Sequence, residues 1–355
     1  MPRPILFAAV AVGSLLVSPA AAPQQNQQPP PPQEQVTFRT QASEVIVPVT
    51  VTDDKGRFLS NLEAKDFRIL DEGRPQRIQF FSHSQKQPIV VGFLIDLSSN
   101  SRIHWDKYQD AILELVWDLL PGEKTTQGYL IGYSSTAELL VNTTPDSDTI
   151  AAKVRRMKPS GGAAFYDAIY IACTNRDLVK GEPYEPRRVI VVVGDGHDSA
   201  SSHTFDQVLE LAQRNLVTIY GVSTQSFGFD NPAEDVLEKL TNDTGGHVEY
   251  PLNRLYKDVS GYISTPKDAG NYVYDAGTGG YASEISAGIV KAIEGIAGEV
   301  TTQYVLRYIP DLDPEAKPKV FRKIKVEVPS LPTVNIRARN GYYPNGVPGG
   351  LPSQN

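Results

Sequence analysis

The chain has 355 residues, with 34 Lys and Arg against 41 Asp and Glu, a formal net charge of −7 and a pI near 5.4. This acidic balance argues against a nucleic-acid-binding protein, which needs a basic surface. Apolar residues make up 40% and charged residues 21%, an ordinary globular composition that can bury a core. The single cysteine, Cys173, excludes an internal disulfide framework and a cysteine-rich metal centre.

The N-terminal residues have the features of an export signal. Arg3 precedes an apolar run over residues 5–17, and small residues follow at 18–22. Such a run is too short to cross a bilayer as a helix, which needs about 20 residues. We therefore predict a signal peptide over residues 1–22 and an exported mature protein, periplasmic or extracellular, without a transmembrane segment. The Gln/Pro-rich residues 23–35 are expected to form an extended, disordered tether.

A small β unit is predicted over residues 36–84. Its first strand is marked by four alternating valines: Val45, Val47, Val49 and Val51. Turn-forming sequences follow at 53–56 and 71–74, and the second of these separates two further short strands, 67–70 and 77–81.

An α/β pattern begins at residue 89. The apolar run Ile89 to Ile95 is typical of a central parallel strand, and an amphipathic helix follows from Trp105 to Leu119. Further core strands are predicted at 128–133, 189–193, 217–222 and 246–250, and further helices at 149–157, 166–179, 205–213, 233–241 and 283–300. This alternation predicts a doubly wound, mostly parallel α/β domain over residues 88–300.

Strand patterns return in the C-terminal part of the chain. Alternating residues indicate strands at 324–328 and 334–338, and residues 303–309 add a third candidate. The segments 36–84 and 301–344 are each too short to build a convincing core. We therefore predict that they pair with each other in a small β-sandwich-like module into which the α/β domain is inserted. Residues 345–355 are expected to be a disordered tail.

Polar side chains gather where the predicted core strands end. Asp96, Ser98 and Asn100 follow the first core strand, and Asp195 follows the core strand predicted at 189–193. Open α/β sheets bind ligands beyond the carboxyl ends of their strands, so we expect these four residues to converge. Carboxylate, hydroxyl and amide oxygens are hard ligands that suit Mg²⁺ or Mn²⁺.

These residues resemble the von Willebrand factor type A (VWA) domain and its metal-ion-dependent adhesion site. Asp96, Ser98 and Asp195 match the family pattern, whereas Asn100 stands in place of a serine and Ala163 in place of a threonine. With its signal sequence, tether and flanking strands, the chain also resembles the exported VWFA-related proteins of acidobacteria. The resemblance implies a non-enzymatic module for protein binding or adhesion, in which a bound metal accepts an acidic side chain of the partner. Because the Ala163 methyl group offers no lone pair, either water completes the metal's coordination or the site is inert.

A Tyr/Gly-rich insertion is predicted at residues 251–282, far longer than the usual connection of about two to six residues. It contains four candidate partner-binding residues: Tyr256, Tyr262, Tyr272 and Tyr274. This leaves a second function open, that of a structural or envelope-assembly protein with an inert metal site, which binds through the insertion or the β module. Enzyme activity is not expected, because Ser98 has no identifiable His partner and lies in no Gly-x-Ser-x-Gly sequence.

Overall fold

The computed structural model describes residues 44–83, 88–102, 105–123, 125–175, 178, 186–224, 232–251, 277–311 and 320–344. All of these residues belong to one compact unit, Ala42–Asn355. The expected signal peptide, the tether, the C-terminal tail and most of the tyrosine-rich insertion lie outside the described residues.

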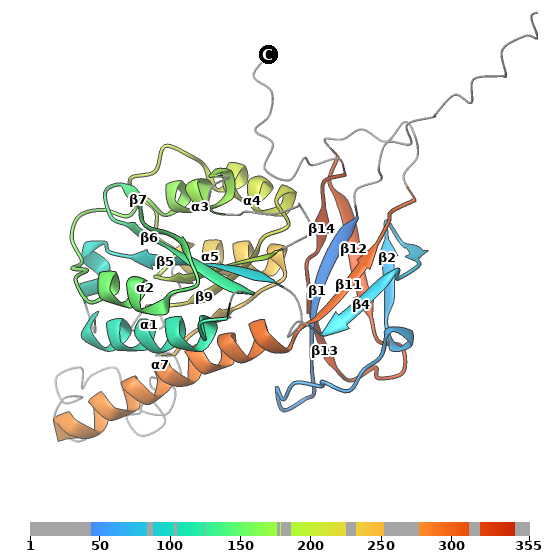
Figure 1. Ribbon diagram of the computed structural model, residues 1–355, viewed down its shortest axis with the longest axis horizontal. Helices are drawn as coiled ribbons and strands as arrows, with labels where there is room; N and C mark the ends of the chain where they lie inside the picture. The colour runs from blue at the N-terminus through green and yellow to red at the C-terminus, as the bar shows by residue number, and fades with distance from the viewer. Residues whose placement is uncertain are drawn as a thin grey trace, which may run out of the picture. The chain divides into compact units, whose positions relative to one another are not determined.

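A six-stranded sheet forms the centre of the α/β domain (Figure 1). In spatial order its strands are β10 (Val248–Glu249), β9 (Thr218–Val222), β8 (Arg187–Val193), β5 (Ile89–Asp96), β6 (Thr126–Tyr133) and β7 (Ala137–Thr144). All neighbours pair in parallel except β7, which runs antiparallel to β6. Every residue of the apolar strand β5 after Ile89 is buried, as expected of a central strand covered on both faces. The predicted mostly parallel α/β fold is confirmed.

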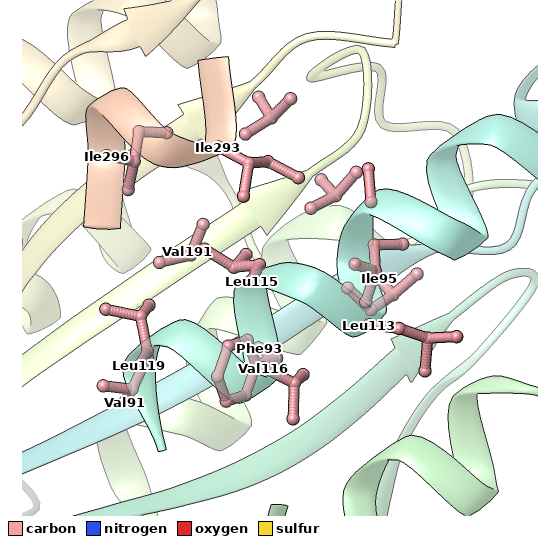
Figure 2. Packing of buried hydrophobic residues seen from close by; sticks show 14 of the residues in the cluster. Val91, Phe93, Ile95, Leu113, Leu115, Val116, Leu119, Val191, Ile293 and Ile296 are labelled. Carbon is pink, nitrogen blue, oxygen red and sulfur yellow. The ribbon is translucent and has the colours of Figure 1, made fainter. Parts of the chain in front are cut away.

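Helices cover both faces of this sheet. The helices are α1 (Trp105–Leu119), α2 (Ser147–Val154), α3 (Phe165–Thr174), α4 (Phe205–Arg214), α5 (Pro232–Thr244) and α7 (Gly277–Thr302), with short 3-10 helices η1 (Ala64–Asp66) and η3 (Ser99–Arg102). Val91 and Phe93 of β5 pack against α1, α2 and α7, and Figure 2 shows Leu115 and Ile293 on this face. Alternate residues of β5, such as Leu94, pack against α3, α4 and α5. The alternation of side chains along β5 therefore supplies two separate cores.

The segments that flank the α/β domain build two antiparallel four-stranded sheets, which we call the β module. One sheet contains β13 (Asn335–Ala338), β1 (Val45–Thr52), β11 (Tyr304–Tyr308) and β4 (Phe80–His83), and the other contains β14 (Gly341–Tyr342), β12 (Arg322–Glu327), β2 (Arg68–Asp71) and β3 (Arg74–Gln76). Each sheet mixes strands from both segments, and a third core includes Val47, Ile69 and Leu306. The predicted pairing of the two segments into a β-sandwich-like module is confirmed.

Several elements differ from the sequence predictions. The pattern of apolar and polar residues did not predict strand β7, because this edge strand is partly exposed along both faces and lacks a clear apolar face. The strand predicted at 77–81 begins only at Phe80, as β4, whereas β3 lies before it in the other sheet and residues 77–79 connect the two. Helix α7 begins at Gly277 rather than at residue 283, so the end of the predicted insertion is helical.

A buried carboxylate links the β module to the α/β domain. Glu299 of α7 is 0% exposed. Its Oε1 atom accepts hydrogen bonds from Thr50 Oγ1 of β1 at 2.8 Å and from Tyr220 OH of β9 at 3.3 Å. Its Oε2 atom forms an ion pair with Arg337 of β13. One side chain therefore joins the end of α7 to a sheet of the β module and to the central sheet.

Candidate functional site

The carboxyl ends of β5, β6 and β8 meet at one edge of the central sheet. Asp96, the last residue of β5, lies opposite Tyr133, the last residue of β6. Strand β8 runs parallel to β5 on its other side and ends at Val193, so Asp195 follows at the same edge. The structure thus brings Asp96 and Asp195 to a common site.

Asp96 is a buried carboxylate with one unpaired oxygen. It is 1% exposed, and its Oδ1 atom accepts a hydrogen bond from the backbone N–H of Ser98 at 2.7 Å. Its Oδ2 atom has no partner among the residues that the structure describes. The pKa of Asp96 is raised to about 6: burial is the largest cause, the hydrogen bond from the Ser98 N–H lowers the pKa, and the negative charge of Asp195 raises it. A cation at this position would offset both unfavourable effects.

The loop after β5 places Ser98 and Asn100 beside the two carboxylates. Ser98 is 3% exposed, and its hydroxyl group makes no hydrogen bond to any described residue. Asn100 is exposed, and its Nδ2 atom donates to Asp195 Oδ2 at 3.4 Å. Asp195 Oδ1 accepts a second hydrogen bond from the backbone N–H of His197 at 2.9 Å. All four residues predicted as metal ligands therefore lie at one site, with the amide nitrogen of Asn100 facing Asp195.

The loop that contains Ala163 is fixed next to this site. Ala163 is 1% exposed, and its N–H donates to Ser199 Oγ at 3.0 Å. Its carbonyl oxygen accepts hydrogen bonds from the N–H groups of Ser199 at 2.8 Å and Ala200 at 3.0 Å. The N–H of Ser99 donates to the Gly161 carbonyl at 3.0 Å, which ties this loop to the one after β5. The side chain at position 163 provides no ligand atom, because a methyl group has no lone pair.

Four buried oxygen atoms at this edge of the sheet have no hydrogen-bond partner within the described part of the chain: Asp96 Oδ2, Ser98 Oγ, Ser101 Oγ and Tyr133 OH. Buried polar atoms are nearly always paired, so these four oxygens are suited to contact a bound water or cation. Carboxylate and hydroxyl oxygens fit Mg²⁺ or Mn²⁺. Across the described ranges, no group of three or more His, Cys, Asp or Glu side chains is placed to hold a metal. A cation here would therefore depend on the hydroxyl groups.

Ser101 and Tyr133 are site residues that the sequence patterns did not identify. Ser101 follows a run of small polar residues and is also suited to cap the next helix, which gives it an ordinary structural explanation. Tyr133 ends an apolar strand, where an aromatic residue is normally part of the core. One sequence feature could have identified Tyr133: it lies at the carboxyl end of a strand next to β5, where open α/β sheets bind ligands.

His203, in the loop after β8, has a structural role outside this site. His203 Nδ1 lies 2.7 Å from Asp167 Oδ1, and its ring stacks on Tyr170 with the ring centroids 3.7 Å apart. Asp198 Oδ1 accepts hydrogen bonds from Ser201 Oγ at 2.5 Å and from the N–H of Tyr166 at 3.1 Å. These contacts anchor the loop after β8 to α3.

The candidate partner-binding tyrosines of the insertion, Tyr256, Tyr262, Tyr272 and Tyr274, lie outside the described residues. No described helix combines the length and apolar character that a membrane span requires.

Comparisons with known proteins found one matching family model and several similar solved structures. The family model described as von Willebrand factor type A domain matches residues 91–254. No curated protein matches the chain. Among solved structures, the conserved hypothetical protein BatB from Bacteroides thetaiotaomicron is 17% identical, with 50% of this chain and 97% of that chain covered and a TM-score of 0.37.

Two pilus proteins are also similar. The vWF domain of the type V pili tip protein Mfa5 from Porphyromonas gingivalis is 21% identical, with 32% of this chain and 39% of that chain covered and a TM-score of 0.28. A mutant of the PilB minor pilin from Streptococcus sanguinis is 12% identical, with 54% and 64% covered and a TM-score of 0.36. VWA domains are protein-binding and adhesion modules and are typically not catalytic. Residues 91–254 of the chain match the model of the von Willebrand factor type A domain family.

Proposed function

We propose that this chain is an exported, non-enzymatic binding protein that captures an acidic side chain of a protein partner through Mg²⁺ or Mn²⁺. The observation that carries the proposal is the pair of unpaired buried atoms, Asp96 Oδ2 and Ser98 Oγ, beside a second carboxylate. The protein-binding character of VWA domains supports it. Export, to the periplasm or outside the cell, is supported by the signal features of residues 1–22.

Each residue of the site has a role in this proposal. Asp96 and Asp195 provide two negative charges, and Ser98 provides a neutral oxygen. Asn100 lies on the exposed side of Asp195 and restrains its carboxylate through the 3.4 Å hydrogen bond. A bound divalent cation would supply the positive charge that attracts and coordinates a carboxylate of the partner. The protein residues would fix the cation at the sheet edge, where a partner can approach.

The alanine at position 163 favours a second function. A hydroxyl at this position is part of the VWA pattern, and its replacement by the methyl group of Ala163 removes a ligand. If the site cannot hold a cation, the chain acts as a structural or envelope-assembly protein and binds through its β module or the insertion at 251–282. Metal binding therefore separates the two functions.

Isothermal titration calorimetry of the full chain with Mg²⁺ and with Mn²⁺ tests the proposal. We expect the wild-type protein to bind at least one of them at one site, and Asp96→Ala to abolish that binding. Asp118→Ala is the matched control, because Asp118 is an exposed carboxylate in the last turn of α1 and its loss leaves the site intact. A wild-type protein that binds neither metal would overturn the proposal in favour of the second function.

A further inference from the structure

Two neighbouring residues in the loop after β5, Asn100 and Ser101, have different environments. Asn100 is exposed, and its amide is hydrogen-bonded to Asp195. Ser101 is 3% exposed, and its hydroxyl oxygen has no hydrogen-bond partner in the described ranges. The exposed residue is therefore already paired, whereas the buried residue has a free oxygen.

The Ser101 hydroxyl lies beside the Asp96 carboxylate together with that of Ser98. Both hydroxyls are close enough to lower the pKa of Asp96, although burial dominates and raises it. Neither hydroxyl makes a hydrogen bond of normal geometry, and Asp96 Oδ2 is also unpaired among the described residues. Asp96 Oδ2, Ser98 Oγ and Ser101 Oγ are thus three buried oxygens at the carboxyl end of β5 that have no hydrogen-bond partner in the described ranges.

Three hydrogen bonds, two from backbone N–H groups and one from a side chain, fix this arrangement. The N–H of Ser101 donates to the Ser98 carbonyl at 3.2 Å, which forms the first turn of η3. The N–H of Ser99 donates to the Gly161 carbonyl at 3.0 Å, and Arg102 Nε donates to the Pro159 carbonyl at 3.3 Å. Because η3 is held by the loop that precedes α3, Ser101 is directed inward while Asn100 remains at the surface.

We propose that the hydroxyl group of Ser101, and not the side chain of Asn100, is a ligand of the cation site, together with Asp96 and Ser98. Asn100 is a positioning residue that holds Asp195. The ligand class is a hard divalent cation, Mg²⁺ or Mn²⁺, which prefers oxygen atoms. This inference rests on the proposed function, and it replaces the assignment of Asn100 as a ligand. Ser101 lies one residue beyond the second serine position of the family pattern, and it is the buried residue of η3.

A titration of the full chain with Mn²⁺, in which electron paramagnetic resonance measures the free Mn²⁺, tests this inference. Ser101→Ala is expected to weaken the affinity at least ten-fold, whereas Asn100→Ala is expected to change it by a smaller factor. Urea unfolding of both variants without metal shows whether each is folded. A Ser101→Ala protein that binds Mn²⁺ as tightly as the wild type would overturn the inference and leave the proposed function standing.

A thiol substitution gives a second readout that does not depend on the alanine variant. Ser101→Cys places a soft sulfur at the proposed ligand position and should shift the preference from Mn²⁺ towards Cd²⁺. The ultraviolet absorption of a cadmium–thiolate bond reports the contact directly. Asn100→Cys is the matched control, and Cys173 is present in all the proteins compared. Cadmium–thiolate absorption in Asn100→Cys but not in Ser101→Cys would overturn the inference. A wild type that binds no Mg²⁺ or Mn²⁺ would instead overturn the proposed function, and the inference with it.

Discussion

Gly194 lies directly against the side chain of Asp96. A β-carbon added at Gly194 would lie 2.8 Å from Asp96 Cβ and 2.3 Å from the hydroxyl oxygen of Tyr133. Glycine therefore allows β5, β6 and β8 to bring their polar ends together. We expect Gly194→Ala to lower the free energy of unfolding by about 1–3 kcal/mol, because the added methyl group overpacks a rigid strand end. Urea denaturation of the full chain measures the change.

A glycine with more space around it provides the control for this variant. At Gly295, in α7, a β-carbon would meet one atom, Glu249 Oε1, at an ordinary 3.7 Å. Gly295→Ala is expected to stabilise the protein by about 0.5–1 kcal/mol, because alanine is the better helix former. Equal effects of Gly194→Ala and Gly295→Ala would contradict the close packing at the site.

Replacement of Glu299, at the junction between the β module and the α/β domain, is expected to lower the free energy of unfolding strongly. Its side chain is fully buried and bonded to Thr50, Tyr220 and Arg337. Glu299→Ala removes the acceptor of the hydrogen bonds from the buried Thr50 and Tyr220 hydroxyl groups, and each buried polar group left unpaired costs about 1–3 kcal/mol. Glu299→Ala should therefore unfold at a much lower urea concentration than the wild type.

The exposed residue Glu294 on the same helix provides the comparison for Glu299. Glu294→Ala is expected to change the free energy of unfolding by less than about 0.5 kcal/mol, as is usual for surface positions. If both alanine variants unfold together with the wild type, the buried network at Glu299 does not hold the two parts of the chain together.

The sequence predicted the positions of Asp96 and Asp195 because strand order and parallel pairing are enough to bring them together. The apolar run of β5 identifies a central strand, and polar residues after parallel strands meet at one sheet edge. Ser101 could not be identified in this way. Its inward direction depends on a 3-10 turn and on hydrogen bonds to the loop at Pro159 and Gly161, which spacing alone does not reveal.

The junction between the β module and the α/β domain was predicted only in outline. Pairing of the flanking segments followed from their length, since neither could bury a core alone. The buried Glu299 was not identified, because a glutamate near the end of an amphipathic helix is normally solvated. Its partners lie in β1, β9 and β13, and such contacts depend on how the sheets are placed against α7.

The hydrogen bonds that Asp167 accepts from Ser202 and His203 are expected to make stability depend on pH. Burial raises the pKa of Asp167, but hydrogen bonds from the His203 ring and from the N–H groups of Ser202 and His203 outweigh it, so the net pKa is lowered. A carboxyl group with a lowered folded-state pKa stabilises the protein above its unfolded pKa of about 3.9. That contribution disappears as the pH falls through the folded-state value.

Asp167→Asn should therefore be less stable than the wild type at pH 7, and the difference should shrink as the pH falls below about 4. Urea midpoints measured over a pH series test this expectation. Asp118→Asn, at an exposed carboxylate, is the control and should follow the wild type at every pH. A constant gap between Asp167→Asn and the wild type would show that the charge of Asp167 has no role in stability.

A hydroxyl at position 163 is expected to strengthen metal binding. Ala163 lies in the fixed loop beside the site but offers no ligand atom. Ala163→Ser adds one oxygen with little extra volume, and a ten-fold gain in Mn²⁺ affinity corresponds to about 1.4 kcal/mol. Calorimetry of both proteins measures the gain. Ala164→Ser adds the same atom at the next buried position, and an equal gain in that variant would mean that position 163 does not face the metal.

Removal of the Tyr133 hydroxyl group is expected not to lower the free energy of unfolding of the metal-free protein. That group is buried without a hydrogen-bond partner in the described part of the chain, so Tyr133→Phe removes an unpaired polar atom. The free energy of unfolding should stay the same or rise by up to about 1 kcal/mol. Tyr308→Phe is the matched control, because Tyr308 OH donates to the buried Asp71 Oδ2 at 3.0 Å. Removal of this donor should cost about 1–3 kcal/mol. Urea denaturation compares the two variants, and an equal cost for both would show that the Tyr133 hydroxyl is paired and that the site lacks the free oxygen inferred for it.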